Sequence, residues 1–274
     1  MDRRFSLGAA LLLLFAGALY LWLNPEGQTA APMAPTVSVE ADMPAPERAD
    51  SSAPAGPAAP ALPTDRTHPA FYVLAVSWYP GFCELKPNVP ECRSGVTARF
   101  SLHGLWPGGE YCGVSQDDVA TDQVNHWNDL PAVSLGDATW TALRTAMPGT
   151  RSHLERHEWV EHGSCSGTSQ DVYFAHAAAF LEAINASPVR ELFAASTGRK
   201  LTRAKVAAAF DHAFGTGAGK RVRLSCDDTG SDSIIDELTI ALYGDPFAGG
   251  PLPDLIAAAH PRTGGCDGAL VATP

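Results

Sequence analysis

The sequence predicts an α+β domain in which a largely antiparallel central sheet carries flanking helices and is stapled by disulfides. Strand patterns come first, helical patterns follow, and strand patterns return near the end, an order typical of this fold class. All six cysteines lie within residues 68–274, a stretch of about 200 residues that suits a single domain. An even cysteine count in an exported chain indicates three disulfides, and the residues alone leave all 15 pairings open.

Two strands are expected at the start of this domain. The segment "FYVLAVSWY" at 71–79 is rich in β-branched and aromatic residues and predicts a central strand. The segment "VTARFSLH" at 96–103 alternates between apolar and polar residues, which predicts a half-buried strand that ends with His103 on its polar face. Gly104 and Pro107 are expected to stop the pairing beyond it.

The remainder of the domain contains both helical patterns and strand patterns. Helical patterns occupy 137–147, 171–186, 189–196 and 202–214, and strand patterns occupy 220–226, 234–243 and 268–272. A further helix is expected over 152–163, "SHLERHEWVEHG". Ser152 and Glu155 form a capping-box signature at its start, and Gly163 is a plausible C-cap.

This helix carries a cluster of titratable residues. At about 100° per residue, Glu158, Glu161 and His162 share one face, whereas His157 lies well round from His162. A zinc-protease helix needs two histidines four residues apart with an acid between them. Here the histidines are five apart, which argues against a catalytic zinc site of this kind.

The first 67 residues differ in kind from the domain. The run from Phe5 to Leu23 carries no charge and nearly reaches the roughly 20 residues of a membrane-spanning helix. We expect a cleaved signal peptide or an uncleaved anchor within residues 1–30, and a buried core helix is the remaining alternative. The Pro- and Ala-rich segment 31–67 predicts a disordered linker. The domain at 68–274 would therefore leave the cytoplasm.

Composition restricts the chemistry of the domain. From residue 66 on, 16 lysine and arginine residues face 23 aspartate and glutamate residues, a net charge of −7, which argues against a broad surface for nucleic-acid phosphates. No GxSxG motif or phosphate-cradling loop is present, and the cysteines are assigned to bridges. Histidines beside a carboxylate suit acid–base catalysis near neutral pH, so we expect the substrate to supply its own nucleophile.

The segments "FSLHGLWP" at 100–107 and "HEWVEHGSC" at 157–165 resemble the two catalytic segments of the ribonuclease T(2) family. The resemblance covers roughly 70–270, and "SWYPGFC", "KRVRLSC" and a late "GGC" resemble its bacterial ribonuclease I branch. It implies an endoribonuclease that needs no metal and no cofactor, in which the ribose 2′-hydroxyl attacks the adjacent phosphorus. The products would carry 2′,3′-cyclic phosphate and then 3′-phosphate ends.

The resemblance also implies residue roles. His103 and His162 would be the acid–base pair, with His162 the base and His103 the acid. His157 would hold the phosphate and Glu158 would polarise it. Trp106 would stack on a base, although a core aromatic is the alternative for that position. The implied disulfides are Cys83–Cys92, Cys112–Cys165 and Cys226–Cys266.

Two positions depart from the family pattern. Glu161 replaces the usual lysine, and its carboxylate is expected to repel developing negative charge and to favour protonated histidines nearby. Arg156, Arg151 or Arg99 could compensate. Gly108 replaces an aspartate of many relatives, which weakens any expectation of base preference.

The sequence thus predicts a monomeric endoribonuclease acting on single-stranded RNA with little base specificity. It would be periplasmic or secreted and would contact a membrane only through its N-terminal segment. The alternative is a catalytically weakened or inactive relative that binds RNA or another partner, and Glu161 is its only support.

Overall fold

The computed structural model describes residues 70–93, 95–230 and 232–274. The signal or anchor segment within 1–30 and the linker at 31–67 lie outside the described residues. No helix within the described part of the chain is long and apolar enough to cross a bilayer.

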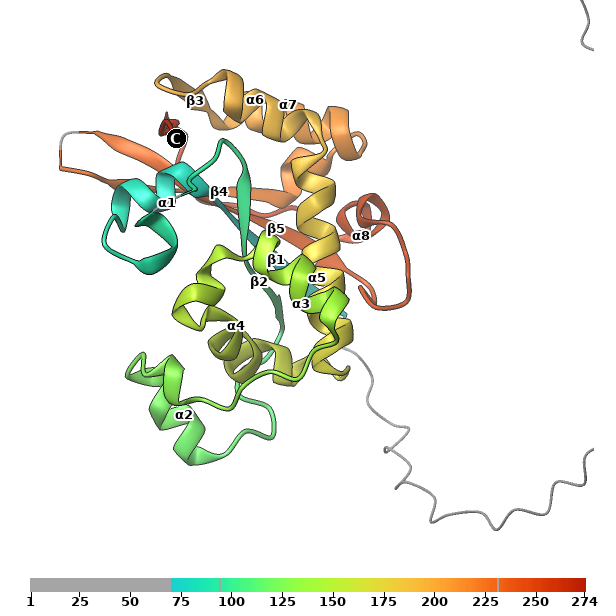
Figure 1. Ribbon diagram of the computed structural model, residues 1–274. Coiled ribbons are helices and arrows are strands. Elements are labelled where there is room, and N and C mark those ends of the chain that lie inside the picture. The colour runs from blue at the N-terminus through green and yellow to red at the C-terminus, as the bar shows by residue number, and fades with distance from the viewer. Residues whose placement is uncertain (1–69, 94, 231) are drawn as a thin grey trace, which may run out of the picture. The chain divides into compact units, whose positions relative to one another are not determined.

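The described domain is α+β, as predicted, and its order of elements is strands, helices and strands (Figure 1). The strands are β1 (Phe71–Trp78), β2 (Phe100–Pro107), β3 (Lys200–Thr202), β4 (Val222–Asp228), β5 (Ser233–Tyr243) and β6 (Gly268–Leu270). The helices are α1 (Tyr79–Leu85), α2 (Gln116–Gln123), α3 (Asp137–Ala146), α4 (Leu154–His157), α5 (Gln170–Asn185), α6 (Pro188–Ala195), α7 (Arg203–Phe214) and α8 (Leu252–Ala258).

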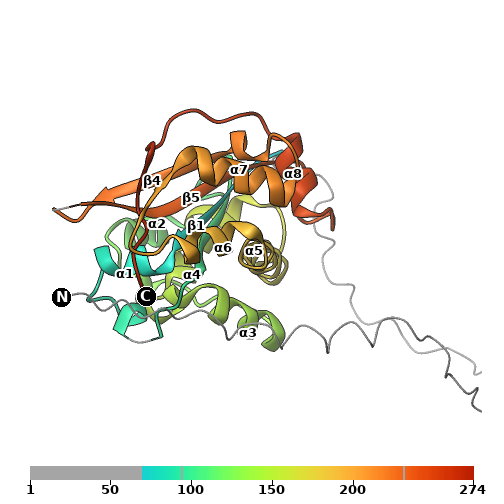
Figure 2. The same ribbon diagram turned by 90° about the horizontal axis from the view of Figure 1, so that it is seen from above.

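The sheet of the described residues has the order β2-β1-β5-β6-β3, and β4 pairs with β5. Its pairs are antiparallel except for a short parallel contact between β5 and β6. Helix α5 packs against β2 and β1, and α3 packs against α5 (Figures 1 and 2). One apolar core joins the sheet to these helices, because the inward side chains of β1, β2 and β5 are almost completely buried.

Serine and threonine caps explain where most of the longer helices begin. The side chains of Ser115, Ser169, Ser187 and Thr202 each accept a hydrogen bond from a backbone N–H in the first turn of α2, α5, α6 and α7. Such caps satisfy donors that the helix itself leaves unpaired. The predicted helices at 137–147, 171–186, 189–196 and 202–214 match α3, α5, α6 and α7 within two residues at each end.

The strand expected at 96–103 is shifted by four residues towards the C-terminus. Strand β2 begins at Phe100 and continues to Pro107, so Gly104 and Pro107 do not end the pairing. Gly104 lies opposite Ala75, and Pro107 lies opposite Tyr72 at the end of the ladder. Pro107 is tolerated because β2 is an edge strand of the sheet.

The helix expected over 152–163 begins at Leu154 and is not a single regular α-helix. The chain forms a 3-10 turn at Pro148–Ser152, the one-turn helix α4, a π-helical turn at Glu158–His162 and another 3-10 turn at Gly163–Cys165. The capping box does not form, because Ser152 donates to Glu91 at 2.5 Å instead. Gly163 has right-handed dihedrals and is not a left-handed C-cap.

The structure joins the three cysteine pairs that the resemblance implies: Cys83–Cys92, Cys112–Cys165 and Cys226–Cys266. Cys112–Cys165 connects the loop after β2 to the 3-10 turn that follows the π-helical turn. In the same loop the Tyr111 backbone N–H donates to the Glu161 carbonyl at 2.7 Å. These links hold the two halves of the candidate site together.

Candidate active site

His103 occupies an irregular position in the sheet. Ala75 of β1 pairs with Gly104 and Val76 pairs with Leu102, so His103 has no partner residue across the ladder and forms a β-bulge. Bulges bend a strand locally and re-aim a side chain, and they are over-represented beside active sites. The bulge directs His103 towards carboxylates of β5 and of the π-helical turn.

Two carboxylates flank the His103 ring. Its Nδ1 lies 2.6 Å from Oε2 of Glu237, and its Nε2 lies 3.6 Å from Oε1 of Glu158. Burial by itself would lower the pKa of His103, but the hydrogen bond to Glu237 and the negative charges of Glu158, Glu237 and Asp236 raise it to about 9. His103 is therefore protonated at neutral pH.

The π-helical turn brings His157 and His162 together. The Gly163 backbone N–H donates to the Glu158 carbonyl five residues back, a hydrogen-bond spacing that sets residues five apart over one another. The two imidazole rings accordingly lie 6.2 Å apart. The expectation that His157 points well round from His162 assumed a regular α-helix and was wrong.

Trp106 and Glu158 join the strand to this turn. Trp106 Nε1 donates to Oε2 of the fully buried Glu158 at 2.9 Å. The Trp106 ring lies 5.2 Å from the His103 ring and 5.3 Å from the His162 ring. Gly104 permits this approach, since a Cβ there would lie 1.9 Å from Glu158 Oε2. Burial raises the pKa of Glu158 to about 7, although the neighbouring His103 and His157 act in the opposite direction.

His162 has surroundings opposite to those of His103. Burial, together with the positive charges of His157 and His103, lowers the pKa of His162 to about 4. The expectation that Glu161 would favour protonation of nearby histidines is therefore wrong for His162. Its Nε2 lies 3.9 Å from Oε2 of Glu161, yet burial is the largest influence on the pKa of His162 and lowers it. His162 is neutral at pH 7 and can accept a proton.

Glu161 points towards the histidines. Its Oε2 lies 3.3 Å from Nε2 of His157. Arg156 does not pair with it, because the Arg156 guanidinium donates to the carbonyls of Asn128 and Leu130. Arg99 pairs with Glu182 at 2.9 Å, so these two arginines are engaged away from Glu161.

Three further residues complete the site and were missed at the level of sequence. Glu237 fixes His103, and Asp122 of α2 lies 2.8 Å from Nδ1 of His157. Trp127 stacks on the His157 ring at 4.6 Å with an interplanar angle of 16°. The acid pair in the strand pattern "IIDELTIALY" was a usable signal for Glu237. The sequence around Asp122 and Trp127 offered none.

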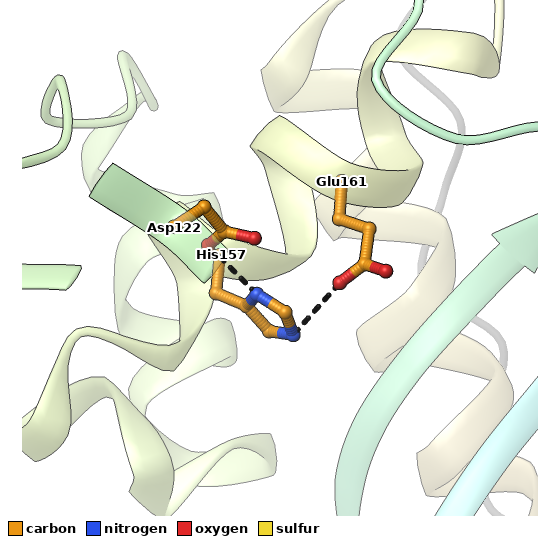
Figure 3. A group of neighbouring side chains, drawn as sticks. All are labelled: Asp122, His157 and Glu161. Atoms are coloured by element: carbon orange, nitrogen blue, oxygen red, sulfur yellow. Dashed lines mark hydrogen bonds and ion pairs between the residues drawn. The ribbon is translucent and has the colours of Figure 1, made fainter. Parts of the chain in front are cut away.

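A cavity of about 380 Å³ opens beside His103. Apolar side chains of α1 and the ring of Trp127 line it together with Glu237 and Asp236. This volume and this mixed lining fall within the range of small-molecule sites. Asp122, His157 and Glu161 separately form a group of potential metal ligands (Figure 3).

Comparisons with known proteins agree on one family. The model of the Ribonuclease T2 family matches residues 69–248. Ribonuclease I of Escherichia coli (strain K12) is 28% identical over 224 residues, which cover 71% of this chain and 82% of that protein. A ribonuclease of Aeromonas hydrophila is 30% identical over 103 residues, covering 36% of this chain and 39% of that protein.

The fold has solved counterparts as well. The crystal structure of the self-incompatibility-associated SF11-RNase of Nicotiana alata superposes with a TM-score of 0.52 at 16% identity. The match covers 74% of this chain and 98% of that chain. Identity at this level supports a shared fold.

Proposed function

This chain belongs to the Ribonuclease T2 family, in its bacterial ribonuclease I-like branch, and is an endoribonuclease; from this premise we propose that His103 and His162 cleave RNA through the ribose 2′-hydroxyl. The observation that carries the proposal is that two histidine rings lie within 5.3 Å of the Trp106 ring, in opposite electrostatic surroundings. Environments that push two pKa values apart separate an acid from a base.

The proposed reaction follows from these protonation states. Neutral His162 removes the proton of the 2′-hydroxyl, and O2′ attacks the adjacent phosphorus. Protonated His103 gives its proton to the departing 5′-oxygen, which leaves a 2′,3′-cyclic phosphate and a free 5′-hydroxyl. Hydrolysis of the cyclic ester to a 3′-phosphate uses water as the nucleophile, with the two roles reversed. DNA lacks the 2′-hydroxyl and is not a substrate.

The remaining residues position the phosphate. His157 holds a phosphate oxygen, with its ring fixed by Asp122 and Trp127. Glu158, buried and hydrogen-bonded to Trp106, polarises the phosphate. Trp106 contributes an aromatic face for a base, a contact that tolerates many sequences. Little base specificity is expected, and single-stranded RNA is the substrate that reaches such a site.

We also propose that the domain works outside the cytoplasm as a monomer. Three disulfides persist only in an oxidising compartment such as the periplasm or the medium. The Arg-flanked apolar run at 5–23 would direct export and would supply any membrane contact.

The product ends test the reaction. The full chain should convert a homopolymer RNA to fragments with 2′,3′-cyclic phosphate ends, leave the matching DNA intact and keep its activity in EDTA. Fragments with 5′-phosphate ends, or activity that EDTA abolishes, would contradict the mechanism. No cleavage of RNA would favour the alternative of an inactive relative that only binds RNA or a partner.

A further inference from the structure

His157 lies between two carboxylates (Figure 3). Oδ1 of Asp122 is 2.8 Å from Nδ1, and Oε2 of Glu161 is 3.3 Å from Nε2. One potential ligand atom of each of the three residues lies within 4.8 Å of the others. Asp122 is buried, and His157 and Glu161 are half-buried. These residues belong to the phosphate side of the site, yet the proposed reaction gives Glu161 no role.

Asp122 fixes the tautomer of His157. A carboxylate that faces Nδ1 accepts its N–H, so the lone pair of the neutral ring sits on Nε2 and points towards Glu161. The second oxygen of Asp122 accepts a hydrogen bond from the Tyr111 hydroxyl at 2.9 Å, which holds the carboxylate in place. At zinc sites, a histidine ligand commonly donates its other ring N–H to a carboxylate in this way.

The distances suit a zinc-sized ion. Zinc binds imidazole nitrogen and carboxylate oxygen at about 2.0–2.2 Å with tetrahedral angles, so neighbouring ligand atoms are separated by roughly 3.4 Å. The His157 Nε2 to Glu161 Oε2 distance is 3.3 Å. His162 Nε2 lies 3.9 Å from the same oxygen, so His162 is the candidate for a third ligand after a local adjustment of its side chain.

We propose that this turn binds a divalent transition metal of the zinc class through His157 Nε2 and the Glu161 carboxylate, with His162 Nε2 as third ligand, and that the bound metal inhibits the enzyme. The inhibition rests on the proposed function, because it follows from withholding His162, the proposed base. The binding of the metal does not depend on the proposed function. Lysine at position 161 could not bind the ion, so the site is a consequence of Glu161.

The electrostatics favour a dication here. Asp122 and Glu110 place further negative charge near the Glu161 carboxylate. A bound dication would relieve this repulsion. Two imidazoles and one carboxylate select zinc-like metals over magnesium and calcium, which need mainly oxygen ligands. The competing explanation is a protonated His157 that pairs with both carboxylates and excludes metal.

Calorimetric titration of the untagged, metal-free full chain with zinc chloride tests the binding. One zinc ion per chain is expected to bind at a saturable site, and magnesium chloride should give no such signal. Glu161→Gln should weaken zinc binding by about tenfold or more, and Asp122→Asn by about 10–100-fold, the usual effect of losing an outer-shell partner. Glu191→Gln is the matched control, since Glu191 is an exposed acid on α6, and should change the affinity by less than about twofold. Circular dichroism verifies that each variant is folded.

Absence of a saturable zinc site, or equal affinity in Glu161→Gln and the wild type, would overturn the site. The inhibition is measured separately as RNA cleavage against zinc concentration. Its midpoint should match the calorimetric affinity, and EDTA should reverse it. Tight binding without inhibition would refute the inhibitory role. Metal-free protein that binds zinc but does not cleave RNA would instead count against the proposed function.

Discussion

The strand side and the helical side of the site each position a catalytic histidine, but they stabilise opposite protonation states of it. His103 reaches the site from a bulge in β2. His157 reaches it from the last position of α4, and His162 from the π-helical turn that follows. On the strand side carboxylates surround the histidine and stabilise its charged form. On the helical side burial and neighbouring positive charge favour the neutral form.

This difference shows that residue type does not fix a catalytic role. Two histidines with the same intrinsic pKa acquire values near 9 and near 4 from their neighbours. This difference in pKa makes His103 on the strand the acid and His162 on the turn the base, although the two side chains are identical. The following experiments test that contrast, beginning with the largest expected effect.

Removing either histidine should abolish most activity. His103→Ala and His162→Ala are each expected to reduce RNA cleavage by about 10²–10⁴-fold, since a positioned acid or base contributes that much. Steady-state cleavage of a homopolymer RNA measures the loss. The matched control is His212→Ala, which changes an exposed histidine in the last turn of α7 and should leave the rate unaltered. A variant at either site that keeps more than about a tenth of the rate would refute its role.

The pH dependence of the cleavage rate should reflect the pKa values of both histidines. Cleavage needs neutral His162, so the rate should rise as pH increases through about 4. It also needs protonated His103, so the rate should fall as pH increases through about 9. Glu237→Gln removes a negative charge that raises the pKa of His103, and the upper limb should move down by roughly 1–3 units.

The control for that shift is Glu191→Gln, which alters an exposed acid on α6 and should leave both limbs in place. An upper limb that stays unchanged in Glu237→Gln would mean that Glu237 does not set the pKa of the catalytic acid, and the contrast between the two sides would lose its basis.

Gly104→Ala should push β2 away from the π-helical turn through a steric clash. The added methyl group would collide with the Glu158 carboxylate and with Trp106 Nε1. Overpacking of this kind costs roughly 1–3 kcal/mol of the free energy of unfolding, and the displaced Glu158 should lower the cleavage rate as well. Urea unfolding measures the stability. Gly108→Ala is the matched control, because a Cβ there meets open space. Equal stabilities for the two variants would show that β2 and the turn are not in tight contact.

Glu161→Lys should have the smallest effect. It would place a cation beside the phosphate on the helical side, and we expect about a tenfold gain in turnover in metal-free buffer. This is less than the roughly 10²–10³ that removal of a preorganised donor costs, because no partner holds the new lysine in place. The upper limb should move less than in Glu237→Gln, since the carboxylates that raise the pKa of His103 are Glu237, Glu158 and Asp236. Reduced turnover would mean that Glu161 supports His157 more than it repels the phosphate.

Local sequence patterns predicted most of the regular elements. The periodicities of 71–79, 171–186 and 234–243 gave β1, α5 and β5 to within a residue or so at each end. Short elements without a long apolar repeat, such as α1 and α8, were missed. Periodicity reports a repeating buried face, and a helix of seven residues is too short to show one.

The sequence by itself determined the fold class, and its motifs pointed to His103, Trp106, His157, Glu158 and His162 as candidates. The tertiary structure decided how these residues meet. The bulge at His103 depends on the register between β1 and β2, and the partners Glu237 and Asp122 come from segments distant in the chain. Registers and desolvation arise from long-range packing, which a local pattern does not encode. For this reason the family motif indicated which histidines to examine, and only the folded surroundings separated the acid from the base.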